Sequence, residues 1–190
     1  GIGSILILVG LIVPYAGLLV ALIGFILVVI GIYNISKITK DDSIFKNYLF
    51  SFILQIVAMV AVFAIFIVTF KMSLSLSIAE LIELAQSETQ ITDPSQIFSN
   101  IEAFLGGCCL ALIVGWVLTL LSAIFLKNSF ESIKEKTKVD LFGTTGLLYL
   151  IGAGLIIIGV GAIILFIALI LQIVAFFQLP DQLKSAKPNI

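Results

Sequence analysis

The residue types that most often perform chemistry are sparse in this chain, and their spacing favours no reaction. Among 190 residues there is no His, and all ten basic residues are Lys. The lack of His removes the commonest metal ligand and the usual general base. The lack of Arg removes the side chain that grips a phosphate or carboxylate at two points. We therefore expect a non-enzymatic protein with no catalytic residue, no metal ligand and no bound cofactor.

The only two cysteines, Cys108 and Cys109, are adjacent. Neighbouring positions on a helix point about 100° apart, which suits neither a shared metal nor a disulfide. The preceding Gly106 and Gly107 favour instead the close packing of small residues against another helix.

Neutral polar residues interrupt the apolar runs, whereas charged residues lie at their ends. Carriers that move charge need ionisable groups at depth in the membrane, so this pattern disfavours a proton- or sodium-coupled transporter. A pore for small neutral solutes stays open. We expect the buried polar side chains to hydrogen-bond to neighbouring helices; they are Gln55, Thr119, Ser122, Tyr149 and Gln172.

The elements that would position these residues are apolar helices. The chain is 61% hydrophobic and 11% charged, whereas soluble domains are about half apolar and about a quarter charged. Its apolar runs reach roughly twenty residues, the length that crosses a bilayer. We predict an all-α, polytopic membrane protein whose first partner is the lipid bilayer. A net charge of −1 gives no attraction to nucleic acid.

Turn signals divide the chain into expected spans. We place turns at Pro14–Gly17 and Gly159–Gly161, a cap at Asp42 or Ser43, a helix start at Asp93-Pro94, and a short membrane-surface helix over 77–88. Because the first run starts at Gly1, we expect further residues before it. The spans are about 1–13, 17–35, 48–70, 102–126, 143–158 and 161–179, with an outer segment over 71–101 and a polar tail over 181–190.

Small residues recur at a spacing of seven in the first and last apolar runs. Such residues let helix backbones approach closely in lipid. We expect them to form helix-packing interfaces within the chain, and an interface between copies in a homo-oligomer stays open. They are Gly10, Gly17, Gly24, Gly31, Gly154, Gly161, Ala168 and Ala175.

The number of spans follows from two patterns. A shift of 144 residues aligns the first and last apolar runs, which indicates a duplicated hairpin. Six spans also place nine of the ten lysines on the cytoplasmic side, where loop lysines gather. A five-span alternative moves Lys184 and Lys187 outside. We predict six spans in the cell membrane, with the lysine-rich loops and both termini cytoplasmic and segment 71–101 outside.

The N-terminal pattern also resembles a known family. GSILILVG, VPYAGLLVALIGFILVVIGI and a following Ser36 with Asp42-Ser43-Ile44-Phe45 are similar to archaeal and some bacterial membrane proteins of unknown function, DUF996. The resemblance implies an archaeal origin and a cytoplasmic-membrane location. It implies no activity and no site residues.

These patterns favour an accessory or scaffold subunit of a larger membrane assembly, with other membrane subunits as partners. The surface helix at 77–88 and the start of the fourth helix would form its outer docking face. The alternative is a channel or carrier for small neutral or lipid-like solutes.

Overall fold

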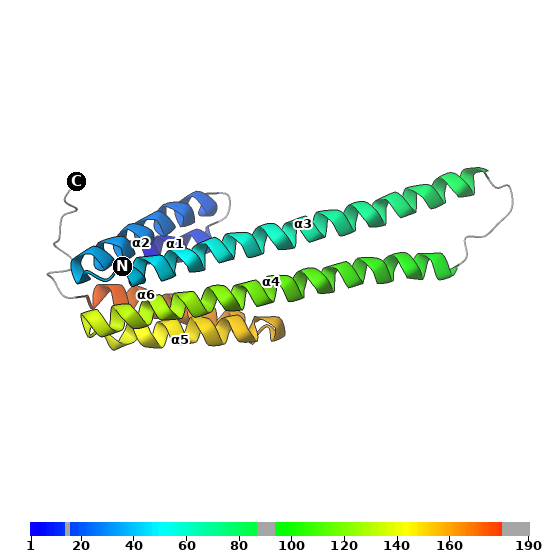
Figure 1. The fold of residues 1–190 in the computed structure, drawn as a ribbon. Helices are drawn as coiled ribbons and strands as arrows, with labels where there is room; N and C mark the ends of the chain where they lie inside the picture. The colour runs from blue at the N-terminus through cyan, green and yellow to red at the C-terminus, as the bar shows by residue number, and fades with distance from the viewer. Residues whose placement is uncertain (14–15, 87–93, 180–190) are drawn as a thin grey trace. The chain divides into compact units, whose positions relative to one another are not determined.

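The computed structural model describes residues 1–13, 16–86 and 94–179, and within these ranges the chain is helical (Figure 1). Short turns separate most of the helices, and the described residues contain no strand. The elements are α1 (Ile2–Ile12), α2 (Gly17–Thr39), α3 (Asp42–Gln86), α4 (Pro94–Thr137), α5 (Asp140–Leu155), the 3₁₀ turn η1 (Ile156–Ile158) and α6 (Val160–Phe177).

The chain forms two compact units. One unit contains residues Gly1–Leu54 and Thr119–Ile190, and the other contains Gln55–Leu118. The long helices α3 and α4 each contribute to both units. We call them the hairpin unit and the two-helix unit.

Two antiparallel helical hairpins begin and end the hairpin unit. In the first, Gly3 of α1 lies against Gly24 of α2, and Gly10 lies against Gly17. The second joins α5 to α6 through η1 and Gly159, whose φ of 82° is a conformation that glycine adopts without strain. This turn coincides with the one expected at Gly159–Gly161. The turn expected at Pro14–Gly17 lies partly outside the described residues.

The core of the hairpin unit draws on α2 to α6. Phe142 is fully buried, and its ring meets Phe130 and Phe176 edge to face at centroid distances of 5.8 and 5.2 Å. Both distances lie in the range that favours aromatic pairs. The buried cluster comprises Val28, Ile32, Ile35, Ile44, Tyr48, Phe130, Ile133, Val139, Phe142, Ala175, Phe176 and Leu179.

Several helices run further than the expected spans. The residues read as polar loops after 35 and 126 are mostly helical, since α2 ends at Thr39 and α4 at Thr137. The surface helix expected at 77–88 is, as far as Gln86, the continuation of α3. Polarity alone does not end a helix, and these segments contain no Gly or Pro. Helix α4 does start at Pro94, as expected, while Asp93, residues 87–88 and the tail 181–190 lie outside the described residues.

Five described helices are long and apolar enough to cross a membrane. They are Leu19–Thr39, Asp42–Lys71, Phe104–Thr137, Asp140–Ile158 and Val160–Phe177. Helix α1 has 11 residues, about 17 Å of helix, which is shorter than the roughly 30 Å of hydrocarbon. The sixth span therefore stays a prediction, as does the duplication of the hairpins.

The two-helix unit is a pair of apolar helix segments with a narrow contact. Gly107 and Gly115 of α4 lie against Thr69 and Val62 of α3, and Ala111 is buried. Large apolar side chains of both helices in this unit are more than half exposed, among them Val60, Phe63 and Val68 of α3 and Leu110, Leu112 and Ile113 of α4. Most large apolar side chains of this unit are therefore not covered by the described chain.

The glycines of α2 give a matched test of helix packing. A Cβ at Gly24 would lie 2.5 Å from the carbonyl oxygen of Gly3, whereas a Cβ at Gly31 would meet nothing within 4 Å. We expect Gly24→Ala to destabilise the protein by about 1–3 kcal/mol, because the backbone of α1 must move. Gly31→Ala should be neutral or slightly stabilising. Thermal unfolding in detergent measures both, and equal effects would contradict the packing argument.

Candidate functional site

The structure brings some of the eight predicted packing residues together and separates others. In the first hairpin a Cβ at Gly17 would overlap the carbonyl oxygen of Gly10, while Gly31 has open space. Helix α1 provides no partner at that level, because Gly3, near its start, already faces Gly24.

In the second hairpin the facing pair is shifted. Gly161 meets Gly152 rather than Gly154, whose only neighbour within 4 Å of a Cβ is Leu120 at 3.9 Å. Ala168 and Ala175 are fully buried. Gly3 and Gly152 were not predicted as packing residues, because neither belongs to the spacing of seven.

The turns after α2 and α4 have the same construction. Each of these helices ends in a threonine that is followed by a lysine. The threonine hydroxyl donates a hydrogen bond to the carbonyl four residues earlier, from Thr39 to Ile35 at 2.7 Å and from Thr137 to Ile133 at 2.8 Å. The following lysines, Lys40 and Lys138, have φ of 52° and 61°. They are the only described non-glycine residues with positive φ.

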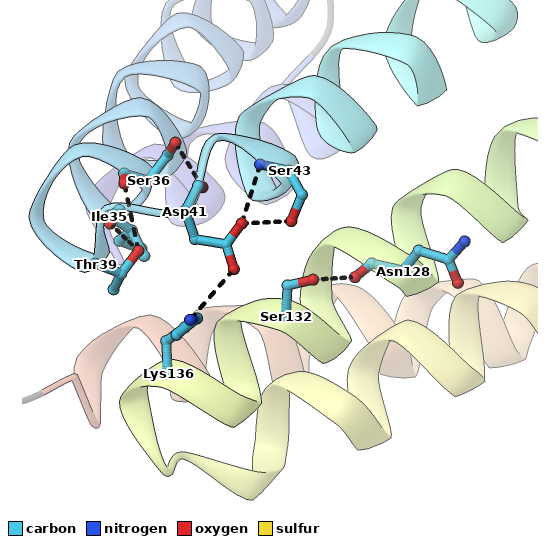
Figure 2. Close-up of polar contacts among 8 residues, drawn as sticks. All are labelled: Ile35, Ser36, Thr39, Asp41, Ser43, Asn128, Ser132 and Lys136. Atoms are coloured by element: carbon cyan, nitrogen blue, oxygen red, sulfur yellow. Dashed lines mark hydrogen bonds and ion pairs between the residues drawn. The ribbon is translucent and has the colours of Figure 1, made fainter.

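Asp41 organises the first of these turns (Figure 2). Its Oδ1 accepts hydrogen bonds from the backbone N–H and the hydroxyl of Ser43, at 3.1 and 2.5 Å. Its carbonyl accepts a hydrogen bond from the hydroxyl of Ser36 at 2.9 Å. The side-chain cap of α3 is therefore Asp41, one residue before the expected Asp42 or Ser43, because the helix starts at Asp42 and its second N–H needs an acceptor.

An ion pair links the first turn to α4. Lys136 Nζ lies 3.7 Å from Asp41 Oδ2 (Figure 2). The pKa of Asp41 is lowered from its ordinary value of 3.8, first by the hydrogen bond from the Ser43 hydroxyl. Partial burial opposes this shift, and the charge of Lys136 adds a smaller lowering. This carboxylate therefore stays ionised and holds the two chain segments together.

Several other charged groups near the turns also form ion pairs. Lys37 lies 3.9 Å from Asp42, and Lys134 lies 3.8 Å from both Glu131 and Asp140. These side chains are between 38% and 91% exposed, so each pair contributes at most about 1 kcal/mol. They neutralise most of the acids in this region.

A buried chain of neutral polar groups joins three helices of the hairpin unit. The hydroxyl of Tyr149 on α5 donates to Gln172 Oε1 on α6 at 2.7 Å. Gln172 Nε2 in turn donates to the hydroxyl of Ser4 on α1 at 3.1 Å. Gln172 and Ser4 are 5% and 0% exposed. The expected hydrogen bond between neighbouring helices is present at Tyr149 and Gln172.

Two further polar contacts join α3 to α4. The hydroxyl of Ser122 donates to the carbonyl of Ser51 at 2.8 Å, and that of Ser129 donates to the carbonyl of Ile44 at 2.8 Å. Of the remaining polar candidates, Gln55 is exposed and Thr119 is half-buried. Sequence reasoning missed Ser4, Ser51 and Ser129, because a serine in an apolar run gives no sign of the face on which it lies.

Taken together, these groups hold helices together. Among the described residues every buried side-chain nitrogen and oxygen has a hydrogen-bond partner, and no three His, Cys, Asp or Glu side chains gather as a metal site. Both cysteines are free. Next to them Gly107 packs against Thr69, as expected of small residues, whereas Gly106 has nothing within 4 Å.

Five long apolar helices, charged groups at helix ends and neutral hydrogen bonds inside are the architecture of a helical, multi-pass membrane protein. Residues 20–170 match the family described as "Protein of unknown function (DUF996)", and the chain belongs to this family. It is 37% identical over 151 residues to an uncharacterized protein of the archaeon Methanocaldococcus jannaschii, covering 80% of this chain and 74% of that one. No solved structure matches the chain.

The buried polar chain yields a prediction. Tyr149→Phe removes the donor to Gln172 Oε1 and leaves an amide oxygen short of one partner. We expect a destabilisation of roughly 0.6–2 kcal/mol, as for hydrogen bonds between membrane helices. Thermal unfolding in detergent measures it. In a protein that already carries Gln172→Leu, Tyr149→Phe should change the stability very little. If the destabilisations of the two changes simply add, the result would contradict a direct hydrogen bond between the two side chains. Gln55→Leu, at an exposed position, serves as the control.

The lowered pKa of Asp41 predicts the pH dependence of stability. A carboxyl whose pKa is lower in the folded state stabilises the fold above its ordinary pKa of 3.8, and this contribution is lost as the pH falls through the lowered value. The unfolding temperature, measured at several values between about pH 3 and 6, should therefore fall as the pH is lowered. The fall should be less steep for Asp41→Asn than for the unchanged protein.

The two partners of Asp41 can be separated in the same experiment. Since the Ser43 hydrogen bond is the largest cause of the shift, Ser43→Ala should flatten this acid slope more than Lys136→Gln does. The reverse order would show that the ion pair dominates.

Proposed function

We propose that this protein is a non-enzymatic accessory or scaffold subunit of a larger assembly in the cell membrane. The observation that carries the proposal is the two-helix unit, in which α3 and α4 contact each other narrowly and leave apolar faces uncovered. Helices α3 and α4 have 45 and 44 residues, roughly 66 Å each. Within the two-helix unit their exposed apolar side chains present helix surface for neighbouring membrane subunits.

Gly106 supports the same reading. It lies on α4 with nothing within 4 Å of a Cβ, while Gly107 beside it is in contact with α3. In lipid, exposed apolar area gives little drive to associate, and small residues at a helix surface provide the close approach that does. We assign the partner-binding face to the side of α4 that carries Gly106.

The lysine-rich turns agree with a cytoplasmic placement of this end. Lys37, Lys40, Lys134, Lys136 and Lys138 lie at or near the two turns, and loop lysines favour the cytoplasmic side. The outer placement of segment 71–101 belongs to the same proposal.

The test is purification of the tagged full-length chain from its native membranes in a mild detergent, with co-purifying proteins identified by mass spectrometry. We expect a stoichiometric set of membrane subunits. Gly106→Leu should weaken their recovery at least several-fold, because a branched side chain blocks close approach, without changing the unfolding temperature. Gly31→Leu, also in open space, is the matched control and should retain the partners.

A chain that purifies alone from native membranes would contradict the subunit proposal. The alternative, a channel or carrier for small neutral or lipid-like solutes, would then be tested by solute flux in reconstituted vesicles. The observation in its favour is the Tyr149–Gln172–Ser4 chain, which places neutral hydrogen-bonding groups among apolar helices. Loss of flux in Gln172→Leu would support this alternative.

A further inference from the structure

Two lysines of the hairpin unit lie within helices, away from the two turns. Lys37, Lys134 and Lys136 are engaged by Asp42, Glu131, Asp140 and Asp41. Lys46 of α3 and Lys127 of α4 have no ion-pair partner among the described residues. The same holds for Lys40 and Lys138, but these two lie in the turns themselves. The ammonium groups of Lys46 and Lys127 therefore stay available to an anion from outside the chain.

Lys46 and Lys127 lie at the same level of the α3–α4 pair. The Ser129–Ile44 and Ser122–Ser51 hydrogen bonds fix the antiparallel register of these helices, because they lie seven residues apart on each helix. Lys46 lies two residues after Ile44, in the direction of Ser51. Lys127 lies two residues before Ser129, in the direction of Ser122. Two positive charges from antiparallel helices thus share one height.

This height is the boundary between polar and apolar sequence. Beyond Lys46 α3 continues with Tyr48 and an apolar run to Phe70, and the last apolar run of α4 ends at Leu126. Lipid head groups occupy the zone just outside the hydrocarbon, where the spans lose their apolar character. A lysine here can keep its stem along apolar surface and its charge among the head groups.

The acids closest to these lysines on their own helices are engaged elsewhere. Asp42 precedes Lys46 by four residues and pairs with Lys37, and Glu131 follows Lys127 by four residues and pairs with Lys134. The charge at the boundary is therefore positive, while the turns beyond it are largely neutralised. This separation suits an anion that approaches from the side, at the height of the bilayer surface.

We propose that Lys46 and Lys127 bind the phosphate groups of anionic membrane lipids. The inference goes beyond the proposed subunit role and rests on different residues. Each lysine near a membrane surface strengthens binding to an anionic lipid about fivefold. The attraction should weaken as salt rises, because it acts between water-exposed charges.

The experiment uses the full-length protein in nanodiscs that contain spin-labelled phosphatidylglycerol or spin-labelled phosphatidylcholine. The fraction of motionally restricted label gives the relative association constant of the two lipids. Each lysine lies two residues, about 200° round its helix, from the residue that bonds the partner helix, so the two face opposite sides of the pair and contact different lipids. We expect a preference for phosphatidylglycerol that falls partly in Lys46→Gln and in Lys127→Gln, and about fivefold in the double variant. Raising the salt to about 1 M should reduce the preference of the wild-type protein.

Three variants serve as controls. Lys138→Gln removes the same charge from the turn after α4, about 15 Å of helix beyond Lys127, and should keep the preference. Lys136→Gln, which breaks the ion pair with Asp41, should lower thermal stability but not lipid selectivity. The conservative change of Lys46 and Lys127 to Arg keeps both charges and should keep the lipid selectivity. This result would show that the double Gln variant loses selectivity through loss of charge and not through misfolding.

Two results would overturn the proposal. One is a wild-type protein with no preference for phosphatidylglycerol. The other is a preference that Lys138→Gln reduces as much as the double Gln variant does, which would show a bulk charge effect. Both results leave the subunit proposal untouched, because partner recovery is measured separately.

Discussion

A polar group placed among apolar helices must find its hydrogen-bond partner within the protein, and the rest of this structure depends on that constraint. In the described chain no buried side-chain nitrogen or oxygen is left without a partner. Tyr149, Gln172 and Ser4 satisfy one another across α5, α6 and α1, and serine hydroxyls of α4 use carbonyls of α3. These bonds fix which helices are neighbours and in what register, which apolar packing alone specifies less sharply.

The same constraint explains why charge collects at the turns. Charged side chains at depth are expensive, so Asp41, Lys136 and their neighbours lie where the chain leaves the apolar spans. There a carboxylate can accept two hydrogen bonds from Ser43 and an ion pair from Lys136 at once. The repeated Thr-Lys ending gives both turns one geometry, with the threonine hydroxyl bonded back along the helix and the lysine at positive φ.

Composition and periodicity predicted the all-helical architecture, the apolar helices and the turn at Gly159, because these depend on local chemistry. The predicted ends of α2 and α4 were wrong. Stretches that contain Lys, Glu and Ser were interpreted as loops, although such residues continue a helix readily. Asp41 was missed as the cap because capping depends on one-residue register. The glycine spacing indicated candidates, but only tertiary packing decides that Gly24 has a partner and Gly31 has none.

The glycines without neighbours carry the argument from structure to function. Glycine inside a helix costs about 0.5–1 kcal/mol relative to alanine. At Gly107 and Gly24 a close approach of another helix offsets this cost, because a Cβ would collide with Thr69 or with Gly3. At Gly106 and at Gly31 nothing in the described chain does so. Of the two, Gly106 lies in the two-helix unit, whose large apolar side chains are mostly exposed. A partner helix packed on that face of α4 would supply the missing contact, and it would cover part of the apolar surface that the two-helix unit leaves exposed.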